Sequence, residues 1–165
     1  MAGIAKYGSY ILQAMKAVAY IDGSSLQNPG YAAIAVRIYD ESGQLLLSLC
    51  EPYGKQTNNY AEYLAYVRCL EEARQLGVTE LCIFTDSELI AKQWSGEYRV
   101  HSENLKPLYG YALEVRQVME VEVRRIPTQS DERLRLTNRM AQEAAKFVQQ
   151  QFATHYLQEV DDERD

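Results

Sequence analysis

Three acidic residues stand where a folded chain could bring carboxylates together. Asp22 ends the apolar run AVAYID, Glu62 lies within TNNYAEYLA, and Asp86 follows the run CIFT. Each is expected where a strand stops or a helix starts, so the three side chains could converge. Carboxylate oxygens are the ligands that Mg²⁺ and Mn²⁺ favour, whereas zinc favours nitrogen and sulfur. The three residues therefore favour an all-oxygen site for a divalent cation.

Uncharged hydrogen-bonding side chains lie close to these acids in the sequence. They are Asn28, Thr57, Asn58, Asn59 and Ser87. Such side chains can hold a phosphate backbone without reading its base sequence. Together with the three acids, they predict metal-dependent phosphodiester chemistry on a nucleic acid.

Each acid also has a purely structural interpretation. Asp22 could be a turn residue, because Asp followed by Gly is common in turns. Asn59 and Glu62 have the spacing of a helix capping box. Asp86 could help to cap the helix that follows it. The three acids alone leave these interpretations open, so the residues around them must decide.

The elements that would position these side chains follow from hydrophobic periodicity. In chain order we expect strands at 16–22, 31–39 and 44–50, a helix at 59–76, a strand at 81–85, helices at 87–94 and 103–119, a strand at 121–126, and a helix from 132 past 152. The order βββαβααβα predicts an α/β fold with a mixed five-stranded sheet and helices on both faces. Ligands of such sheets collect at the carboxyl ends of strands, where Asp22 and Asp86 are placed.

Composition favours one globular domain. Of the 165 residues, 47% are hydrophobic and 24% are charged, which is ordinary for such a domain. We expect an extension at 1–15, a domain at 16–152 and an acidic tail at 153–165. No apolar run approaches the roughly 20 residues that span a bilayer, and no signal-peptide core is visible, so a cytoplasmic protein is expected. We also expect a monomer.

Charge and cysteine content set weaker limits. The net charge of −6 lowers the expected affinity for a polyanion, but bound cations would reverse the field of a carboxylate cluster. The acidic tail EVDDERD also contributes to that charge. Cys50, Cys69 and Cys82 lie in apolar runs without C-x-x-C spacing, and we expect buried free thiols.

Three segments carry a family resemblance. YIDGSSLQNPG, TNNYAEYLA and FTDSELIAKQWSGEYRV resemble, in the same order, the signature motifs of type 1 ribonuclease H, and the resemblance covers about residues 17–148. It implies a ribonuclease-H-like fold and endonucleolytic hydrolysis of the RNA strand of RNA/DNA hybrids, leaving a 5′-phosphate. It also implies two Mg²⁺ or Mn²⁺ ions, with Asp22 bridging both and with Glu62 and Asp86 holding the ion on the attacking side.

The sequence departs from this family at its fourth acidic position. The family pattern reads A-D-x-L-A, whereas residues 137–141 read TNRMA and place Asn138 where an Asp is expected. Helical spacing from Leu134 and Ala141 turns Asn138 toward the sheet. It could be a neutral oxygen ligand of the second metal, which we favour, or an amide satisfied by backbone. Asp131, seven residues earlier, is a weaker candidate for a replacement ligand.

The resemblance also implies which residues would contact the hybrid. Backbone groups of Gly23 and Ser24, with Asn28 and Asn59, would read the RNA strand from the minor groove, where the 2′-hydroxyl distinguishes RNA from DNA. Thr57 and Asn58 would meet the DNA strand, and Ser87 would also contact substrate.

Two further departures bear on activity. The loop at 127–131 lacks the His that some family members carry, and His101 and His155 are expected at the surface. The segment 100–108 is too short and weakly basic for a protruding duplex-binding loop. One alternative is a ribonuclease-H-like module that lost catalysis and only binds nucleic acid or protein. A DEDD-type exonuclease is disfavoured, because Asp22 is followed by Gly-Ser and not by the x-Glu of a D-x-E motif.

Overall fold

The computed structural model describes residues 14–97 and 103–162, with side chains of the last helix described up to residue 152. Residues 1–13 of the expected extension at 1–15, His101, and the side chains of the tail including that of His155 lie outside these described parts. The elements are β1 (Lys16–Ser25), β2 (Gly30–Asp40), β3 (Leu45–Gln56), α2 (Asn58–Gln75), β4 (Glu80–Thr85), α3 (Glu88–Ser95), α4 (Lys106–Val115), β5 (Glu120–Arg125), the short 3₁₀ helix η1 (Thr128–Ser130) and α5 (Glu132–Asp162).

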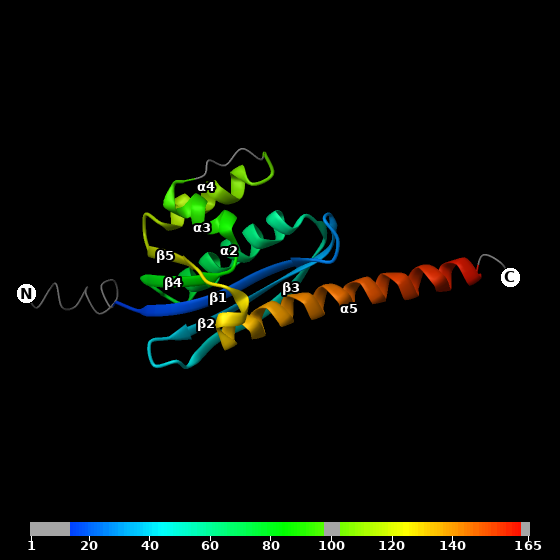
Figure 1. Cartoon of the computed structure of the whole chain (residues 1–165), viewed down its shortest axis with the longest axis horizontal. Coiled ribbons are helices and arrows are strands. Elements are labelled where there is room, and N and C mark those ends of the chain that lie inside the picture. Colours follow the sequence, from blue (N-terminus) through cyan, green and yellow to red (C-terminus); the bar gives the residue numbers. More distant parts are fainter. Residues whose placement is uncertain (1–13, 98–102, 163–165) are drawn as a thin grey trace, which may run out of the picture.

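The five strands form one mixed sheet in the order β3-β2-β1-β4-β5. The first three strands pair antiparallel, and β4 pairs parallel with both β1 and β5. Figure 1 shows α2, α3 and α4 on one face of the sheet and α5 on the other. The predicted fold class, element order and two-sided helix cover are therefore confirmed.

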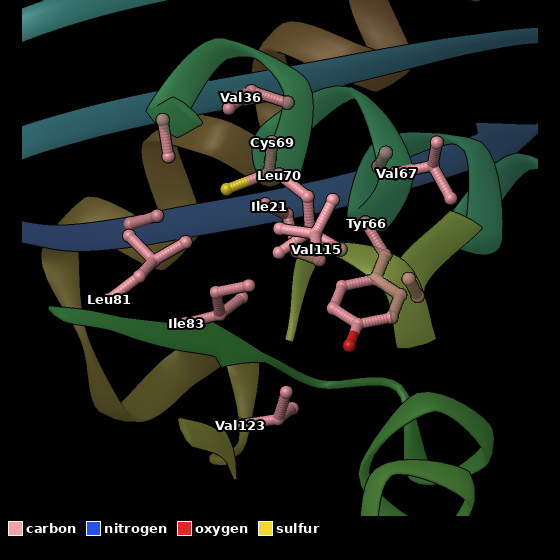
Figure 2. Close-up of a cluster of buried hydrophobic side chains, with 14 of the residues drawn as sticks. Ile21, Val36, Tyr66, Val67, Cys69, Leu70, Leu81, Ile83, Val115 and Val123 are labelled. Carbon is pink, nitrogen blue, oxygen red and sulfur yellow. The ribbon is translucent and has the colours of Figure 1, made fainter. Parts of the chain in front are cut away.

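The main core lies between the sheet and α2. Side chains that alternate along β1 and β2 meet the apolar stripe of α2, and α4 closes the layer. Figure 2 shows this contact, with Ile21 and Val36 from the sheet beside Cys69 and Leu70 of the helix. Cys69 is fully buried as predicted, but Cys82 is only partly buried and Cys50 is exposed. Cys50 lies on the edge strand β3, where its Sγ donates a hydrogen bond of 3.2 Å to the carbonyl of Met140 on α5.

Several predicted element boundaries were wrong: two strands are longer than predicted and one helix is shorter. Strand β1 continues to Ser25, because its last residues still pair with β2 through Gly23–Ile34 and Ser25–Ala32. Strand β3 continues to Gln56 by pairing with the start of β2. Helix α4 is shorter than predicted and begins beside Pro107, which fits only the first turn of a helix. Within the described ranges, no helix is both long enough and apolar enough to span a membrane.

Candidate active site

Asp22 lies inside strand β1 and points to the α5 face of the sheet. It pairs with Ala35 of β2, three residues before the strand ends, so its interpretation as a turn residue is wrong. Its side chain is only 6% exposed. Its Oδ2 accepts a hydrogen bond of 3.0 Å from Nδ2 of Asn138 on α5. A carboxylate is thus fixed under the last helix.

Glu62 enters from α2, on the other side of β1. The helix is capped by Thr57, whose Oγ1 accepts a 3.2 Å hydrogen bond from the N–H of Tyr60. The capping-box interpretation is therefore wrong, since the helix starts earlier than Asn59 and leaves Glu62 in its second turn. Oε2 of Glu62 instead accepts a 2.9 Å hydrogen bond from Oγ of Ser87.

Gly23 sets how closely β1 and α2 approach. A Cβ on this residue would lie 2.2 Å from the carbonyl carbon of Ala61 and 2.4 Å from the backbone nitrogen of Glu62. No side chain fits at that distance, so only glycine allows the strand to reach the helix. The role of Gly23 in packing is therefore to hold Asp22 and Glu62 close in the fold; its predicted contact with substrate stays a prediction.

Asp86 lies directly after β4 and accepts hydrogen bonds from the end of β5 and from the segment that follows it. Its Oδ2 accepts a 2.6 Å hydrogen bond from Oγ1 of Thr128, and its carbonyl oxygen accepts one of 3.2 Å from Nε of Arg125. The cap of α3 is Ser87, whose Oγ accepts from the N–H of Ile90 at 3.3 Å. Asp86 is therefore not needed to cap the helix.

Asn138 takes part in the site as a hydrogen-bond donor. Its amide nitrogen points at Asp22, so it is not an amide satisfied by backbone alone. Its amide oxygen would have to turn toward the cluster before it could hold a cation, and a ligand role stays a prediction. Asp131 caps α5 instead, accepting a 3.0 Å hydrogen bond from the N–H of Leu134.

The three carboxylates act on one another electrostatically. Burial raises the pKa of Asp22 well above its usual value, and the charges of Asp86 and Glu62 raise it further, against the hydrogen bonds from Asn138 and the Gly23 backbone. Burial also raises the pKa of Glu62; the hydrogen bond from Ser87 opposes this and the charge of Asp86 adds to it. The cluster therefore holds negative charges that repel one another.

The side-chain hydrogen bonds that the three carboxylates accept in the described residues come from neutral groups. One amide and two hydroxyls each donate to one carboxylate. Among the residues that the structure describes, the ion pairs of Lys and Arg all involve acids other than these three. The negative charge is thus left for external cations.

The donor set fits a hard divalent cation in chemistry, though not as a finished cage. All donors are oxygens and their charge is uncompensated, which is what Mg²⁺ or Mn²⁺ requires. In the described ranges, however, no three Asp, Glu, His or Cys side chains already lie together as a complete ligand group. A cation held by all three acids would therefore require their side chains to move closer together.

Three of the seven predicted substrate residues line one cavity at the amino end of α2, whereas Gly23, Ser24, Asn58 and Ser87 do not line it. Asn28, Thr57 and Asn59 line a cavity of about 250 Å³ together with Tyr60, Asn104 and Leu105. Its polar lining is uncharged, which suits hydrogen bonding to a phosphate backbone. Asn58 serves the frame instead: its Oδ1 accepts from the N–H of Ser25 at 3.1 Å, and its N–H donates to Asn28 Oδ1 at 3.1 Å.

Sequence reasoning missed three residues at this end of the molecule. Tyr60 and Asn104 line the cavity, and Thr128 holds Asp86. Nothing in the sequence distinguishes Thr128 within its loop, and nothing periodic marks Asn104. A larger cavity of about 590 Å³ lies at the opposite ends of β1, β4 and β5, beside Lys16, Glu80 and Glu120, and contains none of the predicted site residues.

Comparison with known proteins agrees with this geometry. The sequence profile of a family described as reverse transcriptase-like matches residues 20–148. A bifunctional protein of Mycobacterium tuberculosis is 33% identical over 142 residues, which cover 84% of this chain and 38% of that protein. The ribonuclease HI of Halobacterium salinarum is 34% identical over 88 residues, which cover 53% of this chain and 44% of that protein. The chain thus spans about two-fifths of the length of these relatives.

Solved structures of similar fold include three with near-complete overlap. The N-terminal RNase H domain of the Mycobacterium tuberculosis protein has a TM-score of 0.78 at 28% identity, covering 84% of this chain and 99% of that one. RNase H1 of Halobacterium salinarum has a TM-score of 0.72 at 29% identity, covering 79% of this chain and 98% of that one. LC11-RNase H1 in complex with an RNA/DNA hybrid has a TM-score of 0.72 at 30% identity, covering 80% of this chain and 98% of that one.

Proposed function

The chain belongs to the reverse transcriptase-like family of ribonuclease-H-like domains, and on that premise we propose that it hydrolyses the RNA strand of RNA/DNA hybrids. Cleavage would be endonucleolytic and would leave 5′-phosphate ends. The bond that breaks is that between phosphorus and the 3′ oxygen, and the attacking oxygen comes from water. The similarity to RNase H1 proteins, one of them solved with a hybrid, supports this proposal.

The observation that carries the proposal is the shared charge of three acids from separate elements. Asp22 on β1, Glu62 on α2 and Asp86 after β4 are coupled closely enough that the other two raise the pKa of Asp22. Each is held by a neutral donor. An uncompensated acidic cluster of this kind is costly for a fold unless cations bind it.

Mg²⁺ or Mn²⁺, two ions per site, would be held by Asp22, Glu62 and Asp86, with Asn138 as the proposed fourth ligand. When bound, such ions supply an activated water and relieve the charge on the leaving oxygen. Asn138 would release its hydrogen bond to Asp22 and present its amide oxygen instead. With no His at 127–131, this loop offers no imidazole to move the proton.

The cavity at the start of α2 would hold the backbone of the hybrid. Asn28, Thr57 and Asn59 offer neutral donors and acceptors there, and the distance to the acidic cluster is fixed by the helix that also carries Glu62. Such contacts position a duplex without reading its sequence. The RNA strand would be distinguished through its 2′-hydroxyls, by backbone groups of Gly23 and Ser24 together with Asn28 and Asn59.

The direct test uses one RNA strand labelled at its 5′ end and paired with DNA or with RNA. We expect internal cuts of the RNA in the hybrid with Mg²⁺ or Mn²⁺, no cuts after chelation, and no cuts in double-stranded RNA. Equal cleavage of double-stranded RNA would contradict the proposed specificity. No cleavage of the hybrid with either cation across neutral and alkaline pH would contradict the proposed activity.

One observation favours a second function, that of a binding module. Asn138 carries no charge and donates to Asp22, which lowers the negative charge of the cluster by one relative to the pattern that the sequence resembles. A module that only binds would retain hybrid in a gel-shift assay but leave the RNA intact at all cation concentrations. Cleavage in the assay above excludes it.

A further inference from the structure

The segment between β5 and α5 reaches over to the acidic cluster. Oγ1 of Thr128 lies 2.6 Å from Oδ2 of Asp86, and both side chains are half-buried. A carboxylate can only accept, so the threonine hydroxyl is the donor. A hydrogen bond to an ionised oxygen is short and strong, which agrees with this distance. Thr128 therefore fixes one oxygen of Asp86.

The frame that delivers this hydroxyl is itself held in place. The N–H of Ile126 donates to the carbonyl of Thr85 at 2.9 Å, which ties the segment to the end of β4. Nη1 of Arg135 donates to the carbonyl of Gln129 at 2.7 Å, which ties it to α5. The backbone is thus held on both sides of Thr128, by one backbone hydrogen bond and one from the Arg135 side chain, so the position of Thr128 does not depend on its own hydroxyl.

Thr128 differs in this respect from the other hydroxyl of the cluster. Ser87 donates to Glu62 but also caps α3, so its loss would damage the helix. Thr128 opens η1, and the cap of that turn makes no side-chain hydrogen bond. Among the described residues, the hydrogen bond of the Thr128 hydroxyl is the one to Asp86. Its removal should therefore act on the carboxylate and leave the fold intact.

We propose that Thr128 is a positioning residue that holds Asp86 toward Asp22 and Glu62 for cation binding. The acids repel one another, and a free Asp86 would rotate toward solvent. The hydroxyl fixes one carboxylate oxygen against this rotation and leaves the other available to a cation. Groups that orient a ligand in this way commonly change cation affinity about 10- to 100-fold when removed. The proposal rests on the proposed function, because it assigns a role toward the same cations.

The test compares three variants of the full chain. Thr128→Val keeps the shape and removes the hydroxyl, Thr128→Ser restores a hydroxyl, and Ser130→Ala is the matched control. Ser130 lies in the same turn, and its hydroxyl donates to the carbonyl of Pro127 at 2.6 Å, away from the cluster. Calorimetric Mn²⁺ binding to the protein without substrate is the first measurement. The Mn²⁺ concentration for half-maximal hybrid cleavage is the second, and thermal unfolding controls for the fold.

We expect Thr128→Val to weaken Mn²⁺ binding about tenfold and to raise the Mn²⁺ requirement by a similar factor, with Tm and the KM for hybrid unchanged. Thr128→Ser should return to within about twofold of the parent, and Ser130→Ala should match it. Equal Mn²⁺ binding by Thr128→Val and the parent would overturn the proposal, as would an equal loss in Ser130→Ala. Because Mn²⁺ binding is measured without turnover, a parent that binds Mn²⁺ but cuts no hybrid refutes the proposed activity alone. A parent that binds no Mn²⁺ overturns both.

Discussion

The two faces of strand β1 differ in what they demand of the sequence. Residues that alternate along the strand point to opposite faces of the sheet. On the α2 face, Ala19 and Ile21 are fully or almost fully buried in the main core, and Gly23 touches the helix backbone. On the α5 face, Tyr20 packs in a small cluster and Asp22 bonds to Asn138.

One face of β1 therefore sets the distance to the neighbouring helix, and the other carries the buried charge. The α2 face fixes distances, because its contacts leave no room for even one methyl group at Gly23. The α5 face carries a buried acid whose pKa is raised, and so it costs stability when no cation is bound. The close packing on the α2 face thus positions β1, and the α5 face carries the acid that the other two repel.

The largest effect is expected from the charged face. Asp22→Asn removes the acid that all proposed cations share, so RNA cleavage should fall below detection while the fold persists. Relief of repulsion should leave the free energy of unfolding without cations level or higher. Single-turnover cleavage and urea unfolding measure the two effects. Glu88→Gln, an exposed acid outside the cluster, is the control. Near-normal cleavage by Asp22→Asn would show that Asp22 serves the fold alone.

Asn138 tests whether the α5 face supplies a ligand. Asn138→Ala should raise the barrier to cleavage by about 2 to 4 kcal/mol, the usual size of one lost electrostatic contact in a preorganised site. Asn138→Asp restores a charge at nearly the same volume and should lower the cation concentration required. Cation titrations of cleavage by both variants measure this. If Asn138→Ala titrates and turns over like the parent, Asn138 is a structural amide.

The α2 face should respond through stability. Gly23→Ala forces a Cβ against the backbone of Ala61, so the free energy of unfolding should fall by about 1 to 3 kcal/mol. Cleavage should fall as well, since Asp22 and Glu62 move apart. Gly110→Ala is the matched control, because a Cβ there meets nothing within 4 Å and alanine favours a helix. Urea unfolding that shows equal stability for Gly23→Ala and the parent would contradict the close contact.

The smallest effect is a pH dependence of stability without cations. The pKa values of Asp22 and Glu62 are raised in the folded state. At pH values between the unfolded and the folded pKa, folding is therefore accompanied by proton uptake. Their contribution to stability is therefore greatest below the unfolded pKa and is lost as the pH rises through the folded values. The change is at most about 1.4 kcal/mol per pH unit for one proton. The stability gained by Asp22→Asn at neutral pH should shrink at acidic pH, and a gain that is constant with pH would contradict the assignment.

The fold could be predicted from the sequence because periodicity reports burial directly. The order of strands and helices was confirmed. The three acids were selected because they border apolar runs. The end of β1 was placed too early, since pairing with β2 continues through polar residues that carry no apolar signal.

The parts of the site that were missed depend on contacts distant in sequence. Thr128 meets Asp86 across 42 positions, and Asn138 meets Asp22 across 116. Helical periodicity predicted that Asn138 faces the sheet, but it could not predict which of its amide atoms would face Asp22. The packing role of Gly23 could not be predicted either, because no sequence pattern indicates that the backbone of Ala61 and Glu62 lies against it.

Cleavage of a labelled RNA/DNA hybrid by the parent and by Asp22→Asn, across a Mn²⁺ titration, tests the central claim most directly. The acidic cluster predicts internal cuts in the RNA with 5′-phosphate ends, a rate that rises and saturates with Mn²⁺, and no cuts by the variant at any concentration. An intact RNA strand with the folded parent at saturating Mn²⁺, or equal cleavage by Asp22→Asn, would contradict it.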